Sequence, residues 1–278
     1  MKPTIYWLVR HTLPVLFLCS TVMAAQPVLL QYKFGKDSPL KYKLVMKSRA
    51  SFSMPDGAVE NQNMTSAMEL EQELIEKNAD GNYRLSVSIL NASQTVNGQA
   101  RQIPVAAGHT QVITMKPSGE VIDDPKTAPA ATTQLQMVFP TKAVAEGESW
   151  EQKSHISEPI PLETATRYTL DKLEATYPGY GKTTLIRSSM GIENEKTPTG
   201  EQVNSTTKGN LWFDNSKGCI VRSKAASSFK FDLPVNIPGV INSTVKVNLD
   251  LDIEIQLATL GAPQEPEPAQ DKGKPEQK

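Results

Sequence analysis

Residues 179–184, GYGKTT, have the glycines, lysine and hydroxyl groups from which phosphate-binding loops are built. Such a loop also needs a glycine five residues before Gly181, where this chain has Thr176. It further needs a helix directly after it, whose N-terminus holds the phosphate. Here the sequence continues with the alternating pattern of a strand. We therefore interpret residues 179–184 as a turn between two strands.

Few residues in this chain are suited to metal or nucleophile chemistry. Beyond the leader described below, only two histidines, His109 and His155, and one cysteine, Cys219, remain. The histidines lack the close spacing of paired metal ligands, and no second cysteine accompanies Cys219. Asp123-Asp124 and the acidic residues of 250–254 carry oxygen ligands that suit Ca²⁺, but such acidic groups are usually only solvated.

Signatures of catalysis are also missing from the sequence. No G-x-S-x-G segment occurs, and no pair of carboxylates stands out for glycoside cleavage. We expect a protein that is not an enzyme, with no catalytic residue, metal or cofactor. An uncharacterised hydrolase is the alternative, and it requires acidic residues gathered around His109 or His155.

The charge balance excludes further classes of function. The 278 residues include 29 Lys+Arg and 30 Asp+Glu, for a net charge of -1. Nucleic-acid binders generally show a basic excess, so we expect no nucleic-acid partner. Hydrophobic residues make up 38%, which suffices for a core but not for a bundle of membrane spans.

Residues 1–25 are predicted to form a secretory signal peptide. Lys2 and Arg10 precede an apolar run at residues 12–23, and the small residues Ala24 and Ala25 follow it. This order of charged, apolar and small residues is typical of an export signal. We therefore expect an exported protein whose mature chain has no membrane span.

The cleavage site is predicted at Ala24 or Ala25. Cleavage after Ala24 places Val22 and Ala24 at the two positions where the peptidase needs small side chains. Cleavage after Ala25 would place the larger Met23 at one of them. Ala24 is therefore the better candidate.

Two alternatives to a cleaved signal peptide are weaker. An uncleaved anchor needs an apolar run of about 20 residues, which is longer than residues 12–23. Lipidation at Cys19 needs small residues before the cysteine, but Phe17 and Leu18 are large.

Once the leader is removed, Cys219 has no partner for an internal disulfide. We expect it to be a small, half-buried apolar residue at the start of a strand.

Residues 26–260 are predicted to form one β domain, followed by a disordered tail at residues 261–278. The tail has no apolar residue larger than Ala or Pro and alternates in charge, so it cannot form a core. The domain, by contrast, alternates strictly between apolar and polar residues. In residues 245–257, VKVNLDLDIEIQL, every second residue is aliphatic, which predicts a strand with one dry face.

Further strands are predicted throughout the domain by the same alternation. Residues 64–74 also have high helix propensity, but Asp80-Gly81-Asn82 is a hairpin signal and an alternating segment follows it, so we favour a strand. One short helix is predicted within residues 130–138. The remaining predicted strands are residues 40–54, 83–89, 110–116, 148–158, 163–173, 182–192, 203–213 and 219–231.

An internal repeat of about 100 residues is predicted from matching landmarks, with halves at residues 28–125 and 135–258. Phe34-Gly35 in the first half matches Phe139-Pro140 in the second, and the turn at Gly81 matches the turn at Gly181. The predicted fold class is mainly β. We expect long antiparallel strands in a strongly curved sheet or half-barrel, two similar halves, and at most one or two short helices.

The segments V-F-P at residues 138–140 and A-E-G-E-S-W at residues 145–150, with K-F-G-K at 33–36, resemble a family of exported bacterial proteins of unknown function. Those proteins carry a central F-P…P-V-x-x-G-D-S-W motif. This chain has Ala143-Val144 in place of Pro-Val and Glu148 in place of Asp. The resemblance implies a bacterial protein, periplasmic or extracellular, without a known reaction. The long strands are also similar to the half-barrels of periplasmic lipoprotein carriers.

The predicted function is binding rather than catalysis. One face of the predicted sheet is rich in aliphatic residues, and few helices are expected to cover it. We therefore expect an exported, non-enzymatic protein that binds a lipid or another apolar ligand in a concave sheet. The alternative is an envelope or surface protein-interaction module with an envelope protein as its partner.

Overall fold

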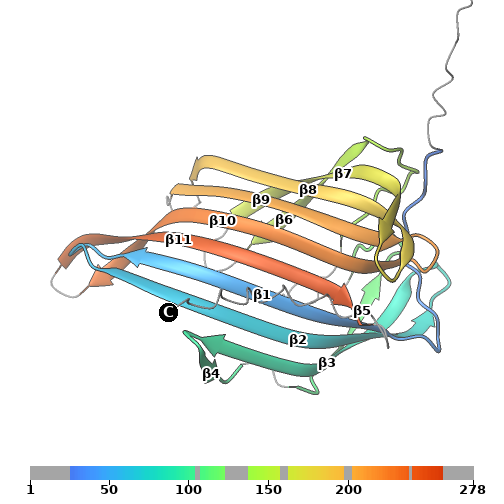
Figure 1. Cartoon of the computed structure of the whole chain (residues 1–278), viewed down its shortest axis with the longest axis horizontal. Coiled ribbons are helices and arrows are strands. Elements are labelled where there is room, and N and C mark those ends of the chain that lie inside the picture. Colours follow the sequence, from blue (N-terminus) through green and yellow to red (C-terminus); the bar gives the residue numbers. More distant parts are fainter. Residues whose placement is uncertain are drawn as a thin grey trace, which may run out of the picture.

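A computed structural model of the chain describes residues 26–103, 107–122, 137–156, 162–196, 202–237 and 240–258 (Figure 1). All regular elements of the described residues are strands, and none of these residues is helical. None of the described segments is therefore a helix that could cross a membrane. In chain order the strands are β1 (Leu40–Ser53), β2 (Val59–Lys77), β3 (Tyr83–Val96), β4 (Gln99–Arg101), β5 (Thr110–Met115), β6 (Ser149–Ile156), β7 (Leu162–Tyr177), β8 (Gly181–Lys196), β9 (Gln202–Asp214), β10 (Cys219–Ile237) and β11 (Val240–Leu257).

The strands form one antiparallel sheet in the order β4-β3-β2-β1-β11-β10-β9-β8-β7-β6, with β5 pairing beside part of β3. The first and last long strands, β1 and β11, therefore lie side by side in the middle of the sheet (Figure 1). From β1 the chain runs outward to β5. It then crosses to β6 at the far edge and returns strand by strand to β11. Among the described strands β4 and β6 at the two ends do not pair, so the sheet does not close on itself.

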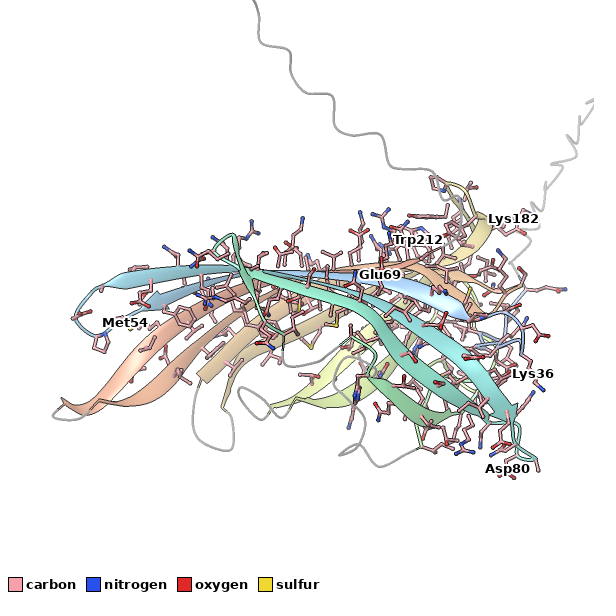
Figure 2. All side chains as sticks on the ribbon, turned by 90° about the horizontal axis from the view of Figure 1, so that it is seen from below. Lys36, Met54, Glu69, Asp80, Lys182 and Trp212 are labelled. Carbon is pink, nitrogen blue, oxygen red and sulfur yellow. The ribbon has the colours of Figure 1, made fainter. Side chains whose placement is uncertain are left out.

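The strand register gives the sheet two different faces. Tyr42, Leu44 and Phe52 of β1 lie opposite Leu257, Ile255 and Val247 of β11, and all six point to one side. We call this side the core face, because it contains the buried apolar residues. The lysines and acidic residues between them point to the other side, which we call the charged face (Figure 2).

One end of the core face is packed with aromatic rings. Tyr32 contacts Phe139 and Phe213 with ring centroids 5.1 and 5.6 Å apart, and Phe139 contacts Phe213 at 4.7 Å. Tyr32 and Phe139 lie in non-strand segments that cross the sheet at this end. Backbone hydrogen bonds hold the first segment to two turns, from Tyr32 N–H to Pro117 and from Lys33 N–H to Gly218. The strands are thereby joined by a common core.

The strands predicted from alternation are confirmed, including residues 64–74, which lie within β2. The predicted mainly β class is also confirmed. The predicted strong curvature and the similarity of the two halves are not established by the sheet, and both stay predictions. Two predicted segments, the signal peptide and the tail, lie outside the described residues. The short helix predicted within residues 130–138 also lies mostly outside them. Its last two residues, Met137 and Val138, are described and are not helical.

Cys219 corrects one prediction about burial. It starts β10 as expected, but it is completely buried rather than half-buried. The cause is its position at the packed end, where Ile220 and Val221 beside it are also buried.

Candidate functional site

The core face has a second apolar region beyond the aromatic core. Ile192, Val203 and Phe231 form a separate cluster on β8, β9 and β10. The register extends this region to Phe229, which faces Leu249 of β11. Phe229, Phe231 and Leu249 are only half-buried. Among the described residues, no second layer of strands or helices packs over this part of the sheet.

A band of small side chains separates the two apolar regions. Across the strands it includes Ser48 of β1, Ser227 and Ala225 of β10, and Thr207 and Gly209 of β9. The Thr207 hydroxyl donates a hydrogen bond of 2.9 Å to Ser227 Oγ. Larger side chains on the neighbouring strands interrupt the band, because Leu251 lies between Ser48 and Ser227 and Met190 lies beside Thr207.

Ser205 carries a polar atom that has no partner. It lies on β9 opposite Phe229 and Ile192, and it is 3% exposed. Its hydroxyl oxygen is buried and makes no hydrogen bond to any of the described residues. A buried hydroxyl without a partner costs free energy, which makes Ser205 an unusual feature of the core face.

The charged face is organised as pairs of opposite charges on neighbouring strands. Lys41 and Glu71 lie 3.0 Å apart, and Arg167 and Glu151 lie 3.4 Å apart. The register places the members of each pair directly opposite one another. Three of these four groups are exposed and Glu71 is half-buried, so each pair contributes little to stability.

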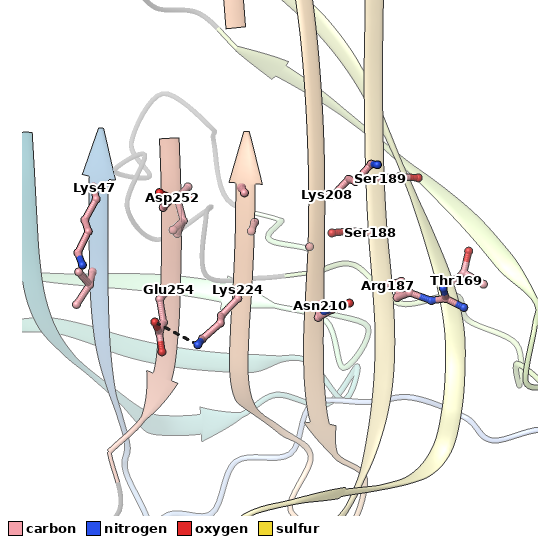
Figure 3. Close-up of a pocket in the computed structure, with 15 residues that line it drawn as sticks. Lys47, Thr169, Arg187, Ser188, Ser189, Lys208, Asn210, Lys224, Asp252 and Glu254 are labelled. Atoms are coloured by element: carbon pink, nitrogen blue, oxygen red, sulfur yellow. Dashed lines mark ion pairs between the residues drawn. The ribbon is translucent and has the colours of Figure 1, made fainter. Parts of the chain in front are cut away.

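A hollow of about 1260 Å³ lies on the charged face over β1, β11, β10, β9 and β8 (Figure 3). Four cations and two acids line it, together with smaller polar residues such as Asn210 and Ser189. The charged residues are Lys47, Arg187, Lys208, Lys224, Asp252 and Glu254. We call this site the charged hollow. Its lining is suited to a polar, anionic ligand rather than an apolar one.

An arginine beside the charged hollow is held by several groups at once. Arg222 forms an ion pair with Glu254 and donates a hydrogen bond of 2.7 Å to the Tyr177 hydroxyl. Burial alone would lower the pKa of Arg222, but the bonds to Tyr177 and Glu254 outweigh it and the pKa is raised. The ring of Trp212 packs against the Tyr177 ring, with 5.5 Å between the ring centroids.

The sequence singled out two residues of the charged hollow, Asp252 and Glu254, only as acidic groups that suit Ca²⁺, and it did not single out the four cations. Each lies on the polar side of an alternating strand, and alternation alone shows only that it faces away from the core. The missing information is the strand order, which brings β8, β9, β10, β11 and β1 together. Lys208 and Lys224, for example, become neighbours only because β9 pairs with β10.

The residues weighed for chemistry do not come together. His109 is exposed just before β5, and His155 lies on β6, far away in the strand order. Gly181 and Lys182 follow the turn between β7 and β8, and β8 begins where a phosphate-binding loop would need a helix. Among the described residues, no three metal-ligating side chains cluster. Ala24 and Ala25 lie outside the described residues.

Part of the chain matches a protein family. Residues 127–220 match the model of a family described as a family of unknown function, DUF6263. The expected likeness to a family of unknown function is thereby confirmed, while the central motif and export stay predictions. No curated protein matches the chain.

Two solved structures give distant matches. One, titled as lipid-protein interactions in lipovitellin, is 12% identical with a TM-score of 0.41, and the match covers 85% of this chain and 27% of that one. The chain thus spans about a quarter of that protein's length. The other is DynF from the dynemicin biosynthesis pathway of Micromonospora chersina, 9% identical with a TM-score of 0.22. This match covers 82% of this chain and 92% of DynF.

Proposed function

We propose that this chain is an exported, non-enzymatic bacterial protein that binds a lipid or another apolar ligand on its core face. The observation that carries the proposal is the second apolar region, where aromatic and aliphatic side chains stay half-buried beyond the packed end. Apolar side chains in a contiguous patch are stabilised when something removes them from water. A more strongly curved, half-barrel form of the sheet would wrap this face around its ligand.

The unpaired hydroxyl of Ser205 supports a ligand with a polar group. A hydrogen bond from a ligand would satisfy this atom and remove the cost of its burial. Phe229 lies directly opposite Ser205 and is half-buried. Rotation of the Phe229 side chain is the movement that would uncover the hydroxyl. An amphipathic lipid, with an apolar chain and an ester or hydroxyl group, has both of the required chemistries.

Extraction of the purified protein tests the proposal. The protein is prepared from its bacterial envelope fraction, extracted with organic solvent, and the extract is analysed by mass spectrometry. We expect a lipid at close to one molecule per chain. Protein without lipid that also fails to bind a fluorescent fatty acyl probe contradicts the proposal.

A matched pair of variants locates the lipid on the core face. Phe229→Asn places a polar group in the second apolar region, whereas Ser228→Asn changes the neighbouring residue on the charged face. We expect Phe229→Asn to lose at least half of the bound lipid and Ser228→Asn to keep it. Far-ultraviolet circular dichroism shows that both variants are folded. Equal lipid content in the two variants contradicts binding on this face.

A second candidate is an envelope protein-interaction module. Among the described residues, β6 pairs only with β7, so its other edge is available for strand addition by a partner. Pull-down from envelope extracts with and without residues 261–278 tests this candidate. A partner that is retained by the full chain and lost on removal of the tail, with no lipid in the protein, would favour it over lipid binding.

A further inference from the structure

We propose that the charged hollow binds a dianionic oxyanion group, such as a phosphate monoester, through Lys208, Lys224, Arg187 and Asn210. This site lies on the face opposite the proposed lipid-binding region, and it is independent of that function.

The strand register places these four residues next to one another on the charged face. Asn210 of β9 lies directly opposite Arg187 of β8 and Lys224 of β10. Lys208 is two residues before Asn210 on the same strand and the same face. Directly opposed residues lie about 5 Å apart and residues two apart on one strand about 7 Å apart. Residues with donor groups from three strands therefore lie next to Asn210, although Lys224 points toward Glu254 and Arg187 points toward Thr169 (Figure 3).

No acidic side chain of the described residues pairs with Lys208. Its neighbours in the register are Ser189 and Ala226, both uncharged. Within the described part of the chain no ion pair involves Lys208, whereas Lys41 and Arg167 on the same face are paired. An anion bound beside Asn210 would therefore gain the Lys208 ammonium without breaking an existing pair.

The other two cations can turn to an anion at low cost. Lys224 lies 3.9 Å from Glu254, and the same carboxylate also pairs with Arg222. When Lys224 turns away, Arg222 still neutralises Glu254. Arg187 pairs with Asp171 through Nη2, and a guanidinium has five N–H donors, so other N–H groups remain for a ligand.

The acids of the charged hollow limit the size of the ligand. Asp252 and Glu254 lie on β11, between Lys47 and the cluster of donors around Asn210. A long polyanion that crossed β11 would meet these carboxylates and be repelled. A single phosphate-sized group over β8, β9 and β10 avoids them, which is why we propose one oxyanion and not a nucleic acid.

Trp212 provides a signal for the test, because it lies two residues after Asn210 on the same face of β9. The full chain is titrated at pH 8 with inorganic phosphate, with sodium chloride at equal ionic strength as the reference. A second arm uses phosphatidylcholine vesicles with and without phosphatidic acid, which separates a soluble ligand from a lipid headgroup. We expect a saturable change in tryptophan fluorescence in at least one arm, and its loss in Trp212→Phe.

Variants of the donors decide the outcome. We expect Lys208→Gln and Asn210→Ala each to weaken binding of the phosphate group about three- to tenfold, because each variant loses one largely exposed charge-assisted contact. Lys230→Gln, on the same face of β10 but outside the charged hollow, should leave affinity unchanged. Circular dichroism checks that all variants fold. The absence of saturable binding in both arms, or equal weakening by Lys208→Gln and Lys230→Gln, overturns the proposal.

Discussion

At the scale of single residues, Asp214 stabilises the turn that the N-terminal segment packs against. Its Oδ1 accepts hydrogen bonds from Ser216 N–H at 2.9 Å, from Ser216 Oγ at 2.6 Å and from Lys217 N–H at 3.0 Å. Burial raises the pKa of Asp214, but these bonds and the charge of Lys217 outweigh it, so the pKa is lowered overall. The ionised carboxylate is therefore favoured in the folded state.

Replacement of Asp214 by Ala should lower the free energy of unfolding at pH 7 by about 1–3 kcal/mol, because three hydrogen bonds to this buried carboxylate are lost. Since the folded pKa lies below the unfolded value of about 3.9, this stabilisation is present above about pH 4 and is lost as the pH falls through the folded pKa. Urea unfolding at several pH values measures both effects. Asp214→Asn is the control, and its stability should depend less on pH in this range. An unchanged acid dependence in Asp214→Asn would contradict the assignment.

The thiol of Cys219 should be unreactive in the folded protein. Burial chiefly raises its pKa to about 11, and the negative charge of Asp214 adds to this while Lys217 opposes it. Both the low thiolate fraction and the burial slow reaction with a disulfide reagent. In a Cys19→Ser chain at pH 8, we expect labelling only as fast as the protein opens, and complete labelling in urea. Rapid labelling of the native protein would show that the packed end opens readily.

At the scale of elements, the turn after β5 depends on a glycine. Gly119 has a φ of 96° and donates its N–H to the Lys116 carbonyl. A Cβ at this position would lie 2.6 Å from the Tyr32 ring and would also collide with the Met137 carbonyl. The turn therefore needs glycine for its backbone conformation and for its close packing against both crossing segments.

Gly119→Ala should destabilise the protein by about 3 kcal/mol or more, because it adds a collision to the strain of a positive φ. Gly98→Ala is the matched control. Gly98 has a φ of 79° with open space around its Cβ position, so only the backbone strain of about 1 kcal/mol is expected. Urea unfolding of the two variants gives the comparison. Equal losses would show that the Gly119 turn is not tightly packed.

The elements were largely predictable from the sequence, because a one-sided sheet needs strict alternation. The β-bulges could not be predicted from the sequence. A shift between Ile220 and Arg222 puts Arg222 on the charged face, although alternation alone would place it with Ile220 on the core face. The charged hollow likewise depends on which strands become neighbours. Strand order is set by long-range packing, and no local pattern around Lys208 or Asn210 contains it.

At the scale of the whole molecule, the sheet is expected to be most stable at its centre. β1 and β11 have a paired strand on both sides, whereas β6 has one among the described residues. Amide hydrogen exchange followed by mass spectrometry should therefore show the slowest exchange in β1 and β11 and the fastest in β6. Within β1, residues near Tyr42 should exchange more slowly than residues near Phe52, which lie outside the aromatic core. Uniform exchange across the strands would contradict this gradient.

The pairing of β1 with β11 also has a consequence for synthesis. Among the described strands β1 is made first and its partner β11 is made last, so one long edge of β1 stays unpaired while β2 to β10 are made. Edges of this kind attract other chains, especially where aromatic and aliphatic side chains alternate along them. The chain would therefore need a chaperone that holds it until β11 is made, and a truncation before Val240 should yield aggregates rather than a smaller folded sheet.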